Sequence, residues 1–82
     1  MNFEDVMDRQ AYEDGLVAGR ADMPDAYAQY KIGTVPYYSW LAGFFDGGSE
    51  VKSGSDWIAA KLSMTARYYK EAVISLKQEE AQ

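Results

Sequence analysis

Paired carboxylates are the side chains whose types and spacing come nearest to a catalytic pattern in this sequence. They are Asp5 with Asp8, Glu13 with Asp14, and Glu79 with Glu80. Acid–base catalysis by two carboxyl groups requires that they lie in different environments on either side of a cleft. Helical spacing places the first two pairs on an exposed helix surface, and the third pair lies in the C-terminal tail. We therefore interpret all three pairs as solvated charges.

Other reactive groups are missing or lack their partners. The sequence contains no histidine and no cysteine, which removes the commonest general base, the usual zinc ligands and the thiolate nucleophile. Asp22, Asp25 and Asp46 could hold Mg²⁺ or Ca²⁺, but the segment Asp46-Gly-Gly-Ser-Glu50 lacks the ligand spacing of a calcium loop. Helix capping explains these aspartates better. We expect no catalytic residue, no metal, no cofactor and no enzymatic activity.

The negative charge is concentrated in the first part of the chain. The 82 residues carry a net charge of −5, and residues 1–50 contain nine Asp and Glu against three Lys and Arg. Because nucleic-acid phosphates are bound chiefly by Lys and Arg, this distribution argues against direct nucleic-acid binding. It suits a basic surface on a protein partner, where carboxylates would take the place of phosphates, or simply solubility. The candidate interaction residues are Asp5, Asp8, Glu13 and Asp14.

The sequence is also rich in aromatic residues, with seven Tyr, three Phe and two Trp. Tyrosine is enriched in protein interfaces because it offers a large contact area and a hydroxyl group at small entropic cost. The alternatives are that these rings fill a small core or that they stack on a nucleotide base. We expect Tyr38 and Tyr68 to be the more exposed rings. The candidate interaction tyrosines are Tyr30, Tyr37, Tyr38 and Tyr68.

Apolar and small residues recur at helical spacing in the first part of the chain. This pattern predicts one helix from Phe3 to about Arg20. Asp22 and Pro24 predict a break and the start of a short second helix that ends near Tyr30.

Two further helices are predicted after this point. Thr34 marks the start of an aromatic-rich helix, and the segment Asp46-Gly-Gly-Ser ends it. Apolar residues every three or four positions predict an amphipathic helix over residues 56–78. Residues 1–47 thus form a helical unit rich in glycine and aromatic residues, and residues 48–55 form a linker loop.

Small and aromatic residues in the first unit form a recognisable pattern. Its residues are Ala11, Gly15 and Gly19, followed by Pro36-Tyr37 and by Trp40, Gly43, Phe44 and Gly47. Inward-facing glycines allow two helices to pack closely, with the large rings filling the space that the small side chains leave. Over residues 11–47 the pattern resembles the ribosome modulation factor family and the small proteins of bacteria, phages and plasmids that share it. The resemblance implies a ribosome-associated factor or a phage-encoded protein.

We therefore predict an all-α, single-domain bundle of three to four helices across residues 1–82. The predicted function is that of a small acidic protein-binding regulator or inhibitor, which the resemblance would direct at a host complex. The alternatives are a ribosome-associated modulation factor and a nucleotide-binding protein. A homodimer is plausible through exchange of the last helix. We find no leader sequence and no apolar run of membrane-spanning length, so we expect a cytoplasmic protein that does not insert into a membrane.

Overall fold

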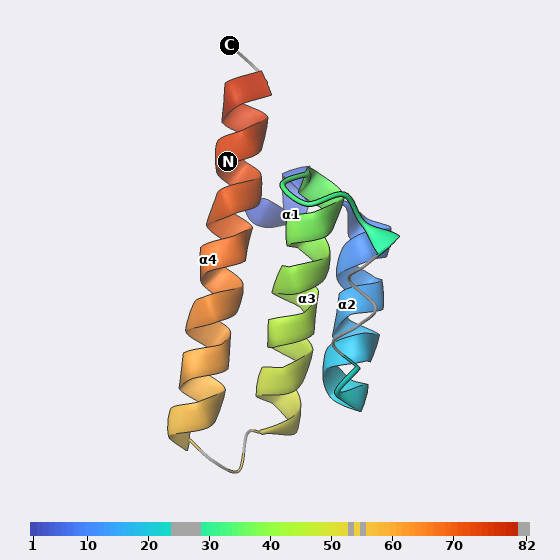
Figure 1. Cartoon of the computed structure of the whole chain (residues 1–82). Helices are drawn as coiled ribbons and strands as arrows, with labels where there is room; N and C mark the ends of the chain where they lie inside the picture. Colours follow the sequence, from blue (N-terminus) through green and yellow to red (C-terminus); the bar gives the residue numbers. More distant parts are fainter. Residues whose placement is uncertain (24–28, 53, 55, 81–82) are drawn as a thin grey trace.

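The computed structural model describes residues 1–23, 29–52, 54 and 56–80, and across these it contains four α-helices and no strand. The helices are α1 (Phe3–Val6), α2 (Arg9–Ala21), α3 (Val35–Val51) and α4 (Asp56–Glu80). The prediction of a small all-α bundle with a long C-terminal helix is confirmed. Figure 1 shows α2 and α3 side by side in the same direction, with α4 returning antiparallel along the other side of α3. The central helix is therefore α3.

Glycines allow the parallel helices α2 and α3 to come into backbone contact. A Cβ atom on Gly15 would overlap the carbonyl oxygen of Trp40, and one on Gly19 would overlap that of Phe44. The glycines that α3 contributes to the same seam are Gly43 and Gly47. The close approach that we expected from two glycines within one helical turn is confirmed.

The core is divided between the two sides of α3, because the helices form a single layer that measures 42 × 24 × 17 Å. Between α2 and α3, Trp40 is only 1% exposed and stacks on Phe44, with the ring centroids 5.2 Å apart. Ala11 packs against the same cluster. Between α3 and α4, the second cluster is built around the fully buried Val73. Large rings thus fill the space beside small residues, as expected.

The first helix is broken where the sequence predicts continuity. Asp8 caps α2, since its Oδ1 accepts a hydrogen bond of 2.9 Å from the backbone N–H of Ala11. The backbone N–H of Asp8 donates to Oγ of Ser39 at 3.0 Å, and Ser39 is fully buried in α3. The predicted single helix over residues 3–20 is therefore wrong. A capping carboxylate and a buried hydroxyl group on another helix hold the break in place.

Asp22 ends α2 instead of starting the next helix. It adopts the left-handed conformation with φ of 55°, and its N–H donates to the carbonyl groups of Ala18 and Gly19. The predicted cap of a following helix is therefore wrong at this position. Most of the predicted short helix, residues 24–28, lies outside the described residues.

The central helix ends later than predicted. Thr34 caps its start as expected, accepting a hydrogen bond from the N–H of Tyr37. The segment Asp46-Gly-Gly-Ser lies inside the helix, so the predicted helix end is wrong, and so is the predicted loop over residues 48–51. Two glycines cost a helix about 1 kcal/mol each relative to alanine, but packing against α2 outweighs that cost. Residues 53 and 55 of the predicted linker lie outside the described residues.

Candidate functional site

The four predicted acidic interaction residues have different surroundings. Asp5 and Glu13 are exposed. Asp8 is engaged as the cap of α2. Asp14 is half-buried, and its carboxylate accepts a hydrogen bond of 3.5 Å from the hydroxyl of Tyr30. Two of the four carboxylates are therefore engaged within the chain, and Asp14 forms a hydrogen bond with one of the predicted tyrosines.

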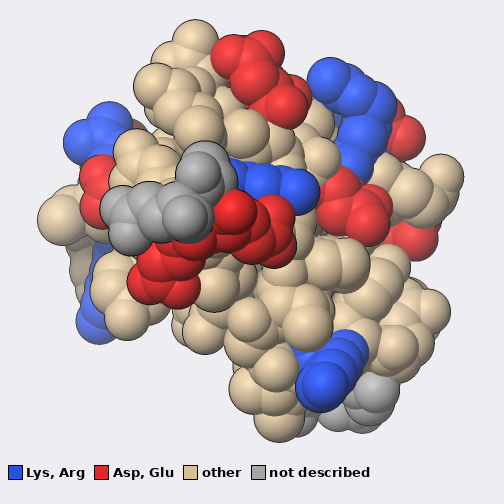
Figure 2. Space-filling model, turned by 90° about the horizontal axis from the view of Figure 1, so that it is seen from above, with Lys and Arg blue, Asp and Glu red and all other residues tan. Residues whose placement is uncertain are grey.

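Charges are mixed at the end of the molecule that carries the last turns of α4. Figure 2 looks onto this end and shows Asp and Glu side chains beside Lys and Arg side chains. One such pair is Lys77 and Glu80, whose charged atoms are 3.5 Å apart. Although the first part of the chain is rich in Asp and Glu, this end of the molecule is therefore not a continuous acidic surface.

Two of the predicted tyrosines, Tyr37 and Tyr38, lie together near the contact between α3 and α4. Tyr38 stacks on Tyr69 with the ring centroids 5.9 Å apart, and the ring of Tyr37 lies 5.3 Å from that of Tyr38. Both are half-buried, so the expected exposure of Tyr38 is wrong: its ring packs against α4. Tyr68 is 68% exposed, which confirms the expectation for that residue. Burial raises the pKa of Tyr69 in the middle of this group.

A polar cluster joins α2, α3 and α4 through one side chain from each helix. The hydroxyl of Tyr12 donates to Oδ2 of Asp46, and Nζ of Lys70 lies 2.8 Å from the same oxygen. The Lys70 ammonium group also lies 5.8 Å from the ring centroid of Phe3. We call Tyr12, Asp46 and Lys70 the three-helix clamp. No local sequence signal predicts it, because its members are far apart along the chain.

The three-helix clamp is suited to holding helices together and not to catalysis. Burial, and then the hydrogen bond to Asp46, raise the pKa of Tyr12 well above its usual value, so this phenol keeps its proton even above about pH 10. The carboxylate already has two donors. A groove of about 430 Å³ opens beside the clamp, and its lining includes Glu4, Arg9 and Glu13. No group of three or more Asp or Glu within the described residues could hold a metal ion.

Alkaline unfolding tests the three-helix clamp. Because folding raises the pKa of Tyr12, the folded chain keeps a proton that the unfolded chain loses above about pH 10. The contribution of protonated Tyr12 to the free energy of unfolding is complete below that pH and is lost as the pH rises. We expect Tyr12 to contribute a fall of up to about 1.4 kcal/mol per pH unit in the free energy of unfolding. In Tyr12→Phe the decline between about pH 9 and pH 11, measured by urea unfolding, should be shallower. If the free energy of unfolding falls equally steeply with pH in the wild type and in Tyr12→Phe, Tyr12 does not take part in the three-helix clamp.

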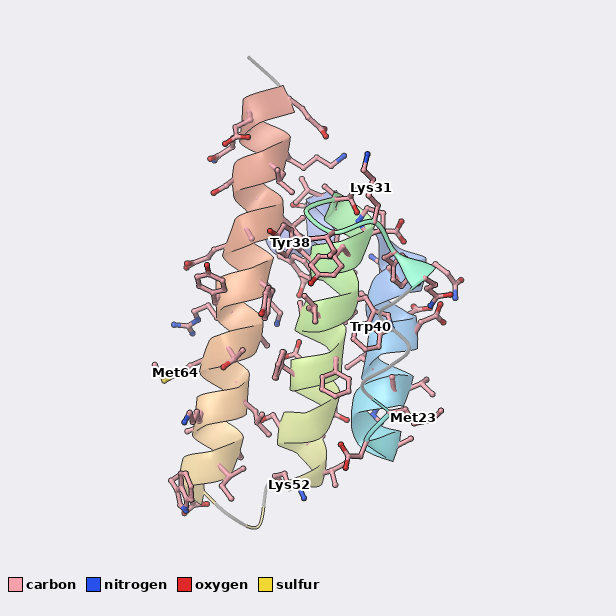
Figure 3. The ribbon with its side chains drawn as sticks, viewed as in Figure 1. Met23, Lys31, Tyr38, Trp40, Lys52 and Met64 are labelled. Atoms are coloured by element: carbon pink, nitrogen blue, oxygen red, sulfur yellow. The ribbon has the colours of Figure 1, made fainter. Side chains whose placement is uncertain are left out.

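The outer side of α4 carries large apolar side chains that lie outside the two core clusters. Trp57, Met64 and Tyr68 are 71%, 72% and 68% exposed. Steps of seven and four residues place them on one side of the helix. Figure 3 shows Met64 pointing away from α3. We call these three residues the α4 outer stripe.

The α4 outer stripe is a second feature that sequence reasoning missed, apart from Tyr68. The apolar positions used to predict the helix belong to its buried side, which includes Ala66 and Val73. Trp57 and Met64 keep the same helical spacing on the opposite side. Apolar residues on two sides of one helix are the signal that could have revealed the stripe.

The stripe differs from the other exposed apolar residues in its regularity. Elsewhere in the described part of the chain, large exposed apolar side chains lie on separate elements. They are Met1, Val17, Met23, Ile32 and Val51. Single exposed apolar residues of this kind are normal on a protein surface.

Comparison with known proteins leaves the family open. Within the described residues, no helix has the length and apolar character needed to cross a membrane. The resemblance to the ribosome modulation factor family stays a prediction. No family model, curated protein or solved structure was found to match this chain.

Proposed function

We propose that this protein is a small protein-binding regulator and that it contacts its partner through the α4 outer stripe. The observation that carries the proposal is the exposure of Trp57, Met64 and Tyr68 along one helix face. Apolar surface gathered in one place and bordered by polar residues is typical of interaction sites. Tryptophan and tyrosine are also the residues that most often dominate the free energy of binding at such sites.

The shape of this surface favours a protein partner over a small molecule. Small-molecule sites are concave and enclose most of their ligand, whereas the stripe runs along the outside of a continuous helix. An exposed helix face of this kind is recognised by a groove or by another helix. Lys61 and Glu71 are exposed on the same helix and would border the contact.

Apolar contacts should contribute more than acidic contacts to binding by this protein. Asp5 and Glu13 remain available to a basic partner, but Asp8 and Asp14 already have hydrogen-bond donors within the chain. A regulator fits better than an enzyme, because His and Cys are absent and Asp46 is held between two donors. The apolar stripe therefore supplies most of the binding free energy.

Affinity capture with matched variants tests this function. Changing all three stripe residues to alanine removes two aromatic anchors that typically contribute about 2 kcal/mol each, so affinity should fall roughly a thousandfold. The control changes Val17, Ile32 and Val51 to alanine, which are also exposed but lie on other elements. Proteins captured by the wild type should be lost with the stripe variant and retained with the control. Circular dichroism checks that both variants fold. Equal capture by both would exclude the stripe as the binding surface.

A further inference from the structure

We propose that the α4 outer stripe binds the same stripe of a second copy of this chain, with the two α4 helices antiparallel. The inference rests on the proposed function, because it names the partner of that surface. It is carried by a self-complementary arrangement of charged and apolar residues along the outer side of α4.

The stripe is part of a longer repeat on the same side of the helix. Steps of four and three residues connect Trp57, Lys61, Met64, Tyr68, Glu71 and Ser75. This alternation is the heptad spacing of paired helices. All six positions are exposed. We call them the α4 outer seam.

Symmetry decides how two such seams can match. In a two-fold interface, residue i of one copy contacts residue j of the other, and j contacts i. An antiparallel pair centred on the level of residue 66 places Lys61 of one chain opposite Glu71 of the other, twice. The same register places Met64 opposite Tyr68. The outermost positions, Trp57 and Ser75, also fall opposite each other. One register thus gives every position of the seam a counterpart, with opposite charges facing each other at Lys61 and Glu71 and large apolar side chains at Met64 and Tyr68.

The two charges select the antiparallel arrangement. A parallel in-register pair would place Lys61 against Lys61 and Glu71 against Glu71, and like charges directly opposed are unfavourable. Among the described residues, neither of these side chains takes part in an ion pair. Both are therefore available for a contact between chains.

The length of the seam sets the expected strength of association. The seam extends over 18 residue steps, which correspond to about 27 Å of helix. A contact between two single helices of this length belongs to the small, transient class of interfaces. We expect a dimer with a dissociation constant on the order of micromolar, which forms as the concentration rises.

Charge reversal measured by sedimentation equilibrium tests the register. Lys61→Glu and Glu71→Lys should each weaken the dimer at least tenfold, because each places like charges opposite each other at two points. The double variant K61E/E71K swaps the charges and should associate within about threefold of the wild type. The matched control is Arg67→Glu, which makes the same charge change at an exposed position outside the seam and should leave the dimer intact.

Introduced thiols test the orientation. The chain has no cysteine of its own, so a short bis-maleimide reports only the added sites. A mixture of Trp57→Cys and Ser75→Cys chains should cross-link between the two kinds of chain, at a concentration well above the weakened dissociation constant expected from the loss of Trp57. Neither kind should cross-link with itself, because equivalent positions lie about 27 Å apart along an antiparallel pair. Self-cross-linking of Ser75→Cys would indicate a parallel pair and overturn the proposal.

The outcomes separate this inference from the proposed function. A wild-type protein that stays monomeric at millimolar concentration, or a dimer unchanged by Lys61→Glu, would overturn the inference. If the stripe variant still loses its captured proteins in that case, the partner is a different protein and the proposed function stands. If capture is also unchanged, the proposed function fails as well.

Discussion

Alanine at Gly15 should destabilise the protein by about 3 kcal/mol, whereas alanine at Gly48 should stabilise it by about 1 kcal/mol. The difference lies in what the new methyl group meets. At Gly15 the three nearest atoms all belong to the backbone of α3, beginning with the carbonyl oxygen of Trp40. Backbone inside a packed helix cannot move aside as a side chain can, so α2 and α3 must separate. That separation also loosens the packing around the Trp40 ring.

Gly48 provides the matched control because it lies in the helix that Gly15 contacts. Among the described residues, a methyl group there would meet only Cδ1 of Leu62, at 3.6 Å, which is an ordinary van der Waals contact. Alanine is about 1 kcal/mol better than glycine inside a helix. For a domain of this size, 1 kcal/mol corresponds to roughly 4–8 °C in the midpoint of thermal unfolding. Thermal and urea unfolding should therefore move in opposite directions for Gly15→Ala and Gly48→Ala. A loss of stability in both would contradict the glycine-mediated contact.

A second glycine on the facing helix sharpens the same test. A Cβ atom on Gly43 would overlap the carbonyl oxygen of Tyr12, so Gly43→Ala forces the same two helices apart from the other side. Once the helices have separated for one methyl group, the second has more room. The double variant with Gly15→Ala should therefore lose less stability than the two single variants combined.

The presence of the main helices and the close packing of two of them could be predicted from the sequence. Both depend on how apolar residues and glycines are spaced along the chain. Gly15 and Gly19 lie within one turn, where glycine is costly, and that cost indicated a close neighbour. Helix ends were harder, because they depend on residues far away in the sequence. The break before α2 is held by Ser39, and the continuation of α3 through Gly47 depends on packing against α2.

The candidate site was only partly predictable for the same reason. The sequence identified Tyr68 as exposed, but it could not distinguish Tyr38, whose exposure depends on whether α4 packs beside it. The sequence favours Asp46 as a capping residue at a helix end, whereas it lies within α3 and forms an ion pair with Lys70. The sequence shows how many carboxylates the chain has, but not which of them already accept hydrogen bonds from other residues of the chain.

Truncation of the two tryptophans should affect different quantities, the stability of the fold for Trp40 and association for Trp57. Trp40 is 1% exposed between α2 and α3, and Figure 3 shows it on the side of α3 that faces α2. Removing a buried tryptophan side chain costs about 3–5 kcal/mol, which is a large share of the roughly 4–12 kcal/mol expected for a domain of this length. Trp40→Ala should therefore be largely unfolded or melt at a much lower temperature. Trp40→Phe keeps most of the ring and should remain folded enough for its loss of stability to be measured.

Trp57→Ala should leave the free energy of unfolding within about 0.5 kcal/mol of the wild type, because the side chain is 71% exposed. Its association through the α4 outer stripe should nevertheless weaken by about 2 kcal/mol, or roughly thirtyfold. Urea unfolding measures the first quantity, and titration against the captured partner or against itself measures the second. A large loss of stability in Trp57→Ala would mean that this ring supports the fold. The stripe would then be apolar for a structural reason, and its exposure would not indicate a binding surface.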